Sequence, residues 1–238
     1  MMVITFSVKE DVDYEDYLRK TWVAECWHGG NNEYTARYLF IIDSVEDGTI
    51  EGRYARYLYM DVPVQRFSGV IKHDEAECIL YGSDGETVVG ALQLLFLDNG
   101  KIEATIDWYA NSLHKTYIFR PYNIGDIANF QLSTGVKQQT VEIETWGKVT
   151  LVAGVIQINK PYPCIYFVNE HDEILYRFEA SYQTGSEVYK MLVEDFDSDG
   201  LRDVKIITYF PRALDIEKIE RVFYQMENGE FDTNKYKY

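Results

Sequence analysis

Short runs rich in β-branched and aromatic residues alternate with Gly, Asn and Asp along most of this chain. Val, Ile, Thr, Tyr and Phe fit the pleated surface of a sheet, and apolar residues at every second position indicate a half-buried strand. Residues 11–20 differ, because acids come early and bases late, which predicts one or two helical turns. The strand pattern of the first half predicts strands at residues 37–44, 49–61, 64–72, 75–81, 87–97, 101–109 and 115–120.

Tight-turn signals separate these predicted strands. Residues 46–48, 83–85 and 98–100 each end in Gly preceded by Asp or Asn. Such pairs tolerate the positive φ angles that hairpin turns require. Short strands joined in this way are typical of an antiparallel meander, which closes as a barrel or packs as a sandwich. We therefore expect a barrel or a sandwich in residues 1–130.

The second half repeats the strand pattern after an interruption. Residues 121–135 bring Pro, Asn and Gly together and predict a boundary, and residues 211–220 predict a connection with a short helix. Strands are predicted within residues 139–159, around a turn at Trp146 and Gly147, and at 164–169, 174–179, 188–193, 204–209, 221–227 and 230–233. The expected protein is all-β, with two antiparallel domains at residues 1–130 and 131–238.

The loop between the strands at 188–193 and 204–209 carries the strongest chemical signal. Residues 195–203 read D-x-D-x-D-G-x-x-D. Ca²⁺ takes about six to eight oxygen ligands in flexible geometry, and a glycine at the sixth position of such loops permits a sharp turn. Side chains at loop positions 1, 3, 5 and 9, with the carbonyl at position 7, could therefore converge on one ion. The predicted Ca²⁺ ligands are Asp195, Asp197, Asp199, the Leu201 carbonyl and Asp203.

This loop is not a complete EF-hand. The EF-hand has a bidentate Glu at position 12 of its loop, whereas this chain has Ile206 there. The flanking segments are rich in β-branched and aromatic residues, which favours a β-hairpin over a pair of helices. The alternative interpretation is an acidic solvated turn, because Asp and Gly favour turns without any ion.

Composition narrows the range of partners. The chain has 23 basic and 39 acidic residues, a formal net charge of −16. Nucleic-acid binding requires a basic footprint, so we expect no nucleic-acid partner and instead cations or a basic protein. The sequence contains no run of about 18 apolar residues, so it does not predict a membrane-spanning helix. Cys26, Cys78 and Cys164 match no zinc or disulfide pattern, and we expect three buried thiols.

The last part of the chain resembles a known bacterial family. Residues 174–178, 193–206 and 223–231 give a calcium loop, an aromatic strand and a terminal Asn-Gly-x-Phe hairpin. This arrangement is similar to envelope proteins related to invertebrate-type lysozyme inhibitors, which include immunity proteins against lysozyme-like effectors. The resemblance implies a non-catalytic inhibitor or immunity protein that binds a lysozyme-like or other basic toxin. The loop alone also resembles FG-GAP and VCBS propeller repeats, but propellers need several copies and this chain has one.

Two other functions stay open. The first half could be a barrel that encloses a small apolar ligand, and residues 27–30 (Trp-His-Gly-Gly) would be either a ligand contact or a polar turn. A polysaccharide-acting enzyme would need two opposed carboxylates, for which Asp107, Glu142 and Glu144 are candidates. The sequence contains no nucleophile elbow, phosphate loop or dinucleotide fingerprint, so we predict that the protein is not an enzyme.

The cellular location depends on whether an export segment precedes this chain. Residues 1–9 have no basic start and no apolar core, so they do not predict a signal peptide. We expect the cell envelope or the extracellular space if an export signal precedes the chain, and the cytoplasm otherwise. The free thiols favour the cytoplasm, and the calcium loop favours the outside.

Overall fold

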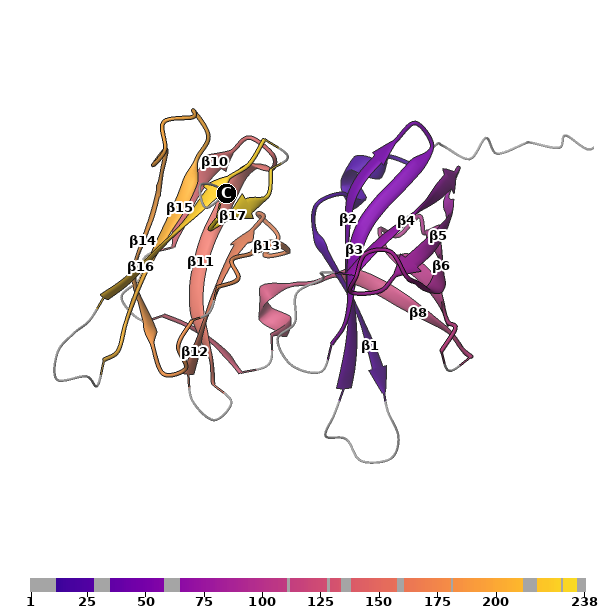
Figure 1. The fold of residues 1–238 in the computed structure, drawn as a ribbon, viewed down its shortest axis with the longest axis horizontal. Coiled ribbons are helices and arrows are strands. Elements are labelled where there is room, and N and C mark those ends of the chain that lie inside the picture. The colour runs from indigo at the N-terminus through magenta and orange to yellow at the C-terminus, as the bar shows by residue number, and fades with distance from the viewer. Residues whose placement is uncertain are drawn as a thin grey trace, which may run out of the picture. The chain divides into compact units, whose positions relative to one another are not determined.

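Eight antiparallel strands close into a barrel in the first part of the computed structural model (Figure 1). Each strand pairs with the next along the chain, and the last pairs with the first. The strands are β1 (Thr21–Trp27), β2 (Thr35–Glu46), β3 (Thr49–Tyr57), β4 (Gln65–Lys72), β5 (Glu75–Tyr81), β6 (Val88–Phe96), β7 (Ile102–Trp108) and β8 (Leu113–Pro121). The all-β prediction is confirmed, and this half is a barrel and not a sandwich.

The structure describes most of the chain in ten segments. These are residues 12–27, 35–57, 65–110, 112–127, 129–133, 138–157, 161–180, 182–211, 218–227 and 229–234. Residues 28–30 of the Trp-His-Gly-Gly motif lie outside the described residues, as does the side chain of Cys26. The same holds for residues 212–217 of the connection with a short helix that was expected at 211–220. No helix among the described segments has the length and apolar character needed to span a bilayer.

A single helical turn packs across the end of the barrel where β1 begins and β6 ends. This turn is the 3-10 helix η1 (Tyr14–Tyr17), shorter than the segment expected from the sequence. The Tyr17 hydroxyl donates a hydrogen bond to the Leu97 carbonyl (3.1 Å), and Trp22 Nε1 donates to the Tyr17 carbonyl (3.0 Å). The Tyr17 ring also meets the edge of Phe96, with ring centroids 4.9 Å apart. These contacts fill this end of the barrel with aromatic side chains.

Local turn chemistry explains why most strands lie where they were predicted. Asp47 and Gly48 connect β2 to β3 with φ angles of 49° and 74°, and two positive φ angles are the requirement of a type I′ hairpin turn. Strand β1 was not predicted. The residues Trp22 and Val23 are both buried, so the alternation of apolar and polar positions that marks a half-buried strand is absent there.

Two sheets pack around a second core in the rest of the chain. One sheet contains β9 (Phe130–Leu132), β10 (Gln139–Ile143), β11 (Gly147–Gln157), β12 (Pro161–Val168) and β13 (Ile174–Arg177). The other contains β14 (Glu187–Glu194), β15 (Asp203–Tyr209), β16 (Lys218–Gln225) and β17 (Phe231–Asp232). Residues from both sheets, including Leu151, Phe167, Ile206 and Phe223, form one buried cluster. Strand β16 begins at Lys218, so the end of the connection expected at 211–220 is strand.

The division between the two units lies at the end of β8. The units are Met1–Pro121 and Tyr122–Tyr238, whereas the sequence analysis placed the division between residues 130 and 131. Backbone hydrogen bonds attach the intervening segment to the second unit. Ile174 N donates to the Tyr122 carbonyl (2.8 Å), and Ile124 N, in the 3-10 turn η2 (Ile124–Asp126), donates to the Asp172 carbonyl (2.9 Å).

Candidate metal centre

The aspartate-rich loop connects two antiparallel strands of the second unit. Strands β14 and β15 pair along their length, and the pair nearest the loop joins Glu194 to Asp203. The last aspartate of the motif is therefore the first residue of β15, while Asp195 and Asp197 lie in the loop itself. This arrangement agrees with the expected β-hairpin.

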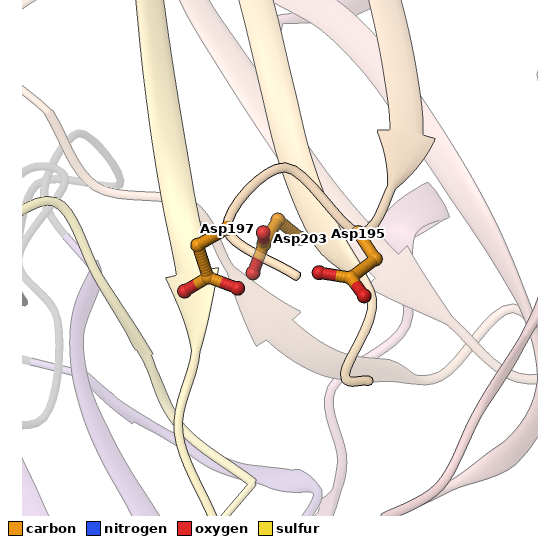
Figure 2. A group of neighbouring side chains, drawn as sticks. All are labelled: Asp195, Asp197 and Asp203. Atoms are coloured by element: carbon orange, nitrogen blue, oxygen red, sulfur yellow. The ribbon is translucent and has the colours of Figure 1, made fainter. Parts of the chain in front are cut away.

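Three carboxylates of the loop converge. Asp195, Asp197 and Asp203 each offer one oxygen, and these three oxygens lie within 4.8 Å of one another (Figure 2). Calcium–oxygen distances are about 2.3–2.6 Å, so two oxygens bound to the same ion lie at most about 5 Å apart. The spacing of these three carboxylates therefore fits a single hard cation.

Backbone amides wrap the loop around Asp195. Its Oδ1 accepts a hydrogen bond from Ser198 N (2.7 Å), and its Oδ2 accepts one from Gly200 N (3.0 Å). Ser198 and Gly200 have positive φ angles of 64° and 91°. The loop thus contains two residues in the left-handed region, and the backbone amides of both donate to the Asp195 carboxylate.

Asp203 is the fully buried member of the cluster, with 0% of its surface exposed. Its Oδ2 accepts a hydrogen bond from Phe196 N (2.8 Å), and its Oδ1 accepts one from Gln225 N (2.9 Å) on β16. The Gln225 side chain in turn accepts a hydrogen bond from Arg202 N (3.2 Å). The buried carboxylate therefore holds the loop and the end of β16 together. No sequence signal indicated the part played by Gln225.

The surroundings of Asp203 disfavour its negative charge. Burial raises the pKa of the Asp203 carboxyl above its ordinary value, and the nearby charges of Asp197 and Asp199 raise it further. The backbone hydrogen bonds from Gln225 and Phe196 lower the pKa but do not cancel the effect of burial. A cation between the three carboxylates would offset both the burial and the repulsion.

Two predicted ligands lie outside this group of three. Asp199 Oδ1 accepts a hydrogen bond from Leu201 N (2.8 Å), and Asp199 N lies 3.2 Å from Asp195 Oδ1. Asp199 therefore shapes the loop through its neighbours in this structure. A role for the Asp199 carboxylate and the Leu201 carbonyl as metal ligands stays a prediction.

The other candidate carboxylates lie on separate parts of the fold. Asp107 is on β7 of the barrel, where His114 Nδ1 lies 2.5 Å from its Oδ1. Glu142 and Glu144 are exposed at β10 and beside it, in the second unit. Comparison of this chain with known protein families, curated proteins and solved structures finds no match.

Proposed function

We propose that residues 195–203 bind one Ca²⁺ ion, held by Asp195, Asp197 and Asp203, and that the ion stabilises the second unit. The observation that carries this proposal is the convergence of the three carboxylate oxygens within 4.8 Å. The bound ion would supply positive charge where three carboxylates repel one another. Asp203 would transmit the effect to β16, because its two oxygens also accept hydrogen bonds from Phe196 and Gln225.

The donor set favours Ca²⁺ over other metals. All three side chains offer hard oxygen donors, and the described cluster contains no His or Cys, the ligands that select Zn²⁺. Mg²⁺ requires near-ideal octahedral geometry at shorter distances, whereas Ca²⁺ accepts irregular loops and additional carbonyl or water ligands. Asp199 and the Leu201 carbonyl are the ligands that would complete the coordination.

Calorimetric titration with CaCl₂ tests the metal site. The intact protein should bind one equivalent of Ca²⁺, and Asp197→Ala should abolish the binding heat because it removes a ligand that lies in the loop and outside the core. Asp199→Ala should weaken binding if this carboxylate completes the coordination. Glu170→Ala is the matched control, since it removes an exposed acid of the same unit away from the loop. Unchanged Ca²⁺ affinity in Asp197→Ala would refute the assignment.

We infer further that the protein is a non-catalytic binding protein for a basic protein, as an inhibitor or immunity protein against a lysozyme-like or other basic toxin. The net charge of −16 and the resemblance in residues 174–233 support this proposal. A surface of one sign attracts a partner of the other, which raises the association rate. Added salt should weaken this attraction, because the Debye length falls to about 8 Å at physiological ionic strength.

A binding measurement against lysozyme-like enzymes tests this second proposal. Immobilised protein should capture a basic enzyme at low salt, and the association rate should fall several-fold as salt increases, while the dissociation rate changes less. Inhibition of that enzyme should likewise be stronger at low salt than at high salt. Turnover of a glycan by the purified chain, lost on substitution of one Asp or Glu, would overturn the non-catalytic interpretation.

A further inference from the structure

The two ends of the barrel differ in the polarity of their interior. At the end covered by η1, the interior contains Trp22, Phe96 and other side chains whose polar atoms are absent or bonded. At the opposite end, where β7 ends and β8 begins, the interior gathers tyrosines and a tryptophan. The Tyr54 and Trp108 rings lie 5.8 Å apart, and the rings of another tyrosine pair, Tyr38 and Tyr117, lie 4.9 Å apart.

The indole N–H of Trp108 lies among these rings. Trp108 Nε1 is buried, and no residue of the described segments accepts its hydrogen. The neighbouring Tyr54 hydroxyl donates to the Tyr81 carbonyl at 2.9 Å and is not a hydrogen-bond partner of Nε1. A buried N–H without an acceptor loses its hydration and gains nothing in return, so such groups in folded proteins call for an explanation. Trp108 is the last residue of β7, at the end of the barrel, and this position favours an acceptor supplied by a ligand.

The hydrogen-bonded wall of the barrel is short beside this group. Strands β1 and β8 pair through two residue pairs, Trp22 with Pro121 and Val23 with Arg120, whereas β7 and β8 pair along the whole of β7. Figure 1 shows β1 and β8 diverging from the point where they meet. The hydrogen-bonded contact of β8 with β1 is therefore confined to the end of β8, and the inner face of β8 toward its start lies beyond this contact.

Lys115 lies on this inner face. It is paired with Ile106, a core residue, and side chains of a cross-strand pair leave the sheet on the same face. Lys115 is nevertheless exposed, and no ion pair of Lys115 occurs among the described residues. Trp108 is its diagonal neighbour across β7 and β8, at a backbone separation of about 7–8 Å that long side chains bridge.

We propose that this end of the barrel binds a small molecule with a planar apolar body and an anionic oxygen group. The rings of Tyr38, Tyr54 and Tyr117 provide the apolar walls. The Trp108 N–H and the Lys115 ammonium donate to the anionic oxygens. Small-ligand sites typically combine aromatic walls with a few placed polar groups, and the mouths of β-barrels are common places for them. In a protein of net charge −16, Lys115 is the feature of this face that attracts an anion.

Two fluorescent probes of similar shape test the proposal. Anilinonaphthalene sulfonate carries an aromatic body and an anionic group, and N-phenyl-1-naphthylamine carries the aromatic body without the charge. The intact protein should bind the sulfonate at one saturable site. Lys115→Met should lower the affinity for the sulfonate about ten-fold, because removing the ammonium removes a charge-assisted hydrogen bond. The affinity for the neutral amine should fall less than about two-fold. Lys101→Met, an exposed lysine beside the opposite end of β7, is the matched control and should change neither.

A second variant separates a ligand role from a structural one. Trp108→Phe keeps an aromatic ring and removes the unpartnered N–H. It should weaken the sulfonate about five-fold, while the melting temperature of the ligand-free protein stays the same or rises. If the role of Trp108 were purely structural, Trp108→Phe would lower both the affinity for the sulfonate and the melting temperature of the ligand-free protein. The proposal fails if the intact protein binds neither probe, if both variants bind the sulfonate like the intact protein, or if fluorescence appears only as the near-ultraviolet circular dichroism of the folded protein disappears.

Discussion

Single residues with unusual backbone angles shape the candidate metal loop. Gly200 has a φ of +91°, and a Cβ placed there would meet no atom within 4 Å. The requirement for glycine at this position is therefore conformational and not steric, since L residues with a side chain rarely adopt such an angle. The place of this glycine in the motif correctly predicted its role in a sharp turn, because turn conformation depends on a few neighbouring residues.

Gly200→Val should weaken Ca²⁺ binding about ten-fold although it removes no ligand. A left-handed conformation costs a β-branched residue about 1–2 kcal/mol, and release of that strain would move the loop away from the binding geometry. Gly85→Val is the matched control, because Gly85 also has a positive φ (+74°) and open space around it but lies in the barrel. Calorimetry on both variants is the measurement, and native affinity in Gly200→Val would show that the turn tolerates a side chain.

Asp84 provides a pH-dependent contribution to the stability of the barrel. The Thr87 hydroxyl, with the backbone amides of Thr87 and Glu86, holds the pKa of Asp84 down at about 2. A carboxyl whose folded-state pKa is lowered stabilises the folded protein above its ordinary pKa, and this stabilisation is lost as the pH falls through the lowered value. Asp84→Ala should therefore be less stable than the intact protein at neutral pH, and the two should converge near pH 2.

Urea denaturation of both proteins across this pH range tests the prediction. Thr87→Val serves as the control, since it removes the hydroxyl donor and should raise the pKa of Asp84 in an NMR titration. A stability difference that stays constant down to pH 2 would contradict the assignment.

Among the elements, β9 is, like β1, a strand that the sequence did not indicate. It contains three residues within a segment rich in Pro, Asn and Gly, and it pairs with β11, which follows later in the chain. Close packing holds the two strands together. A Cβ on Gly154 of β11 would lie 2.4 Å from the Phe130 ring and 2.5 Å from the Gln131 carbonyl oxygen. The position of β9 thus depends on the absence of a side chain at Gly154.

Gly154→Ala should lower the free energy of unfolding by about 1–3 kcal/mol, the usual cost of adding a methyl group to a tightly packed site. Phe130 could shift to make room, but the backbone of Gln131 could not do so without loss of strand pairing. Gly125→Ala is the control, because its nearest contact would be 3.6 Å, an ordinary van der Waals distance. Equal denaturation midpoints for the two variants would show that β9 adjusts freely.

At the scale of the whole molecule, the candidate metal site belongs to the second unit. The proposed ligand site, at the end of the barrel that contains Trp108, belongs to the first unit. The cluster of Asp195, Asp197 and Asp203 contacts β15 and β16 within the second unit. An ion bound only by the folded state stabilises that state by mass action. Metal binding is therefore expected to act on the second unit in particular.

Ca²⁺ at a hundredfold excess over its dissociation constant should stabilise the second unit by about 2.7 kcal/mol. Hydrogen exchange followed by mass spectrometry should show slower exchange in peptides from the loop, β15 and β16, and no change in peptides from the barrel. A chelator should reverse the effect, and Asp197→Ala should not respond. Identical exchange with Ca²⁺ and with chelator would mean that the ion does not contribute to folding.

The sequence by itself determined most strands, the hairpin turns and the identity of the acidic loop. Strand periodicity and turn conformation involve residues that are neighbours in the chain. The turn at Asp47 and Gly48 and the acidic loop at residues 195–203 could therefore both be predicted from the sequence. The regular meander also indicated a barrel or a sandwich, because short connections leave few alternatives.

Only the tertiary structure decided what depends on residues far apart in the chain. It closed the barrel by pairing Trp22 with Pro121, and it placed the division between the units where β8 ends. It buried Asp203 against the backbone of Gln225, and it left the Trp108 N–H buried without an acceptor in the described part of the chain. These features follow from burial and from contacts between distant strands, and the local sequence pattern carries no record of either.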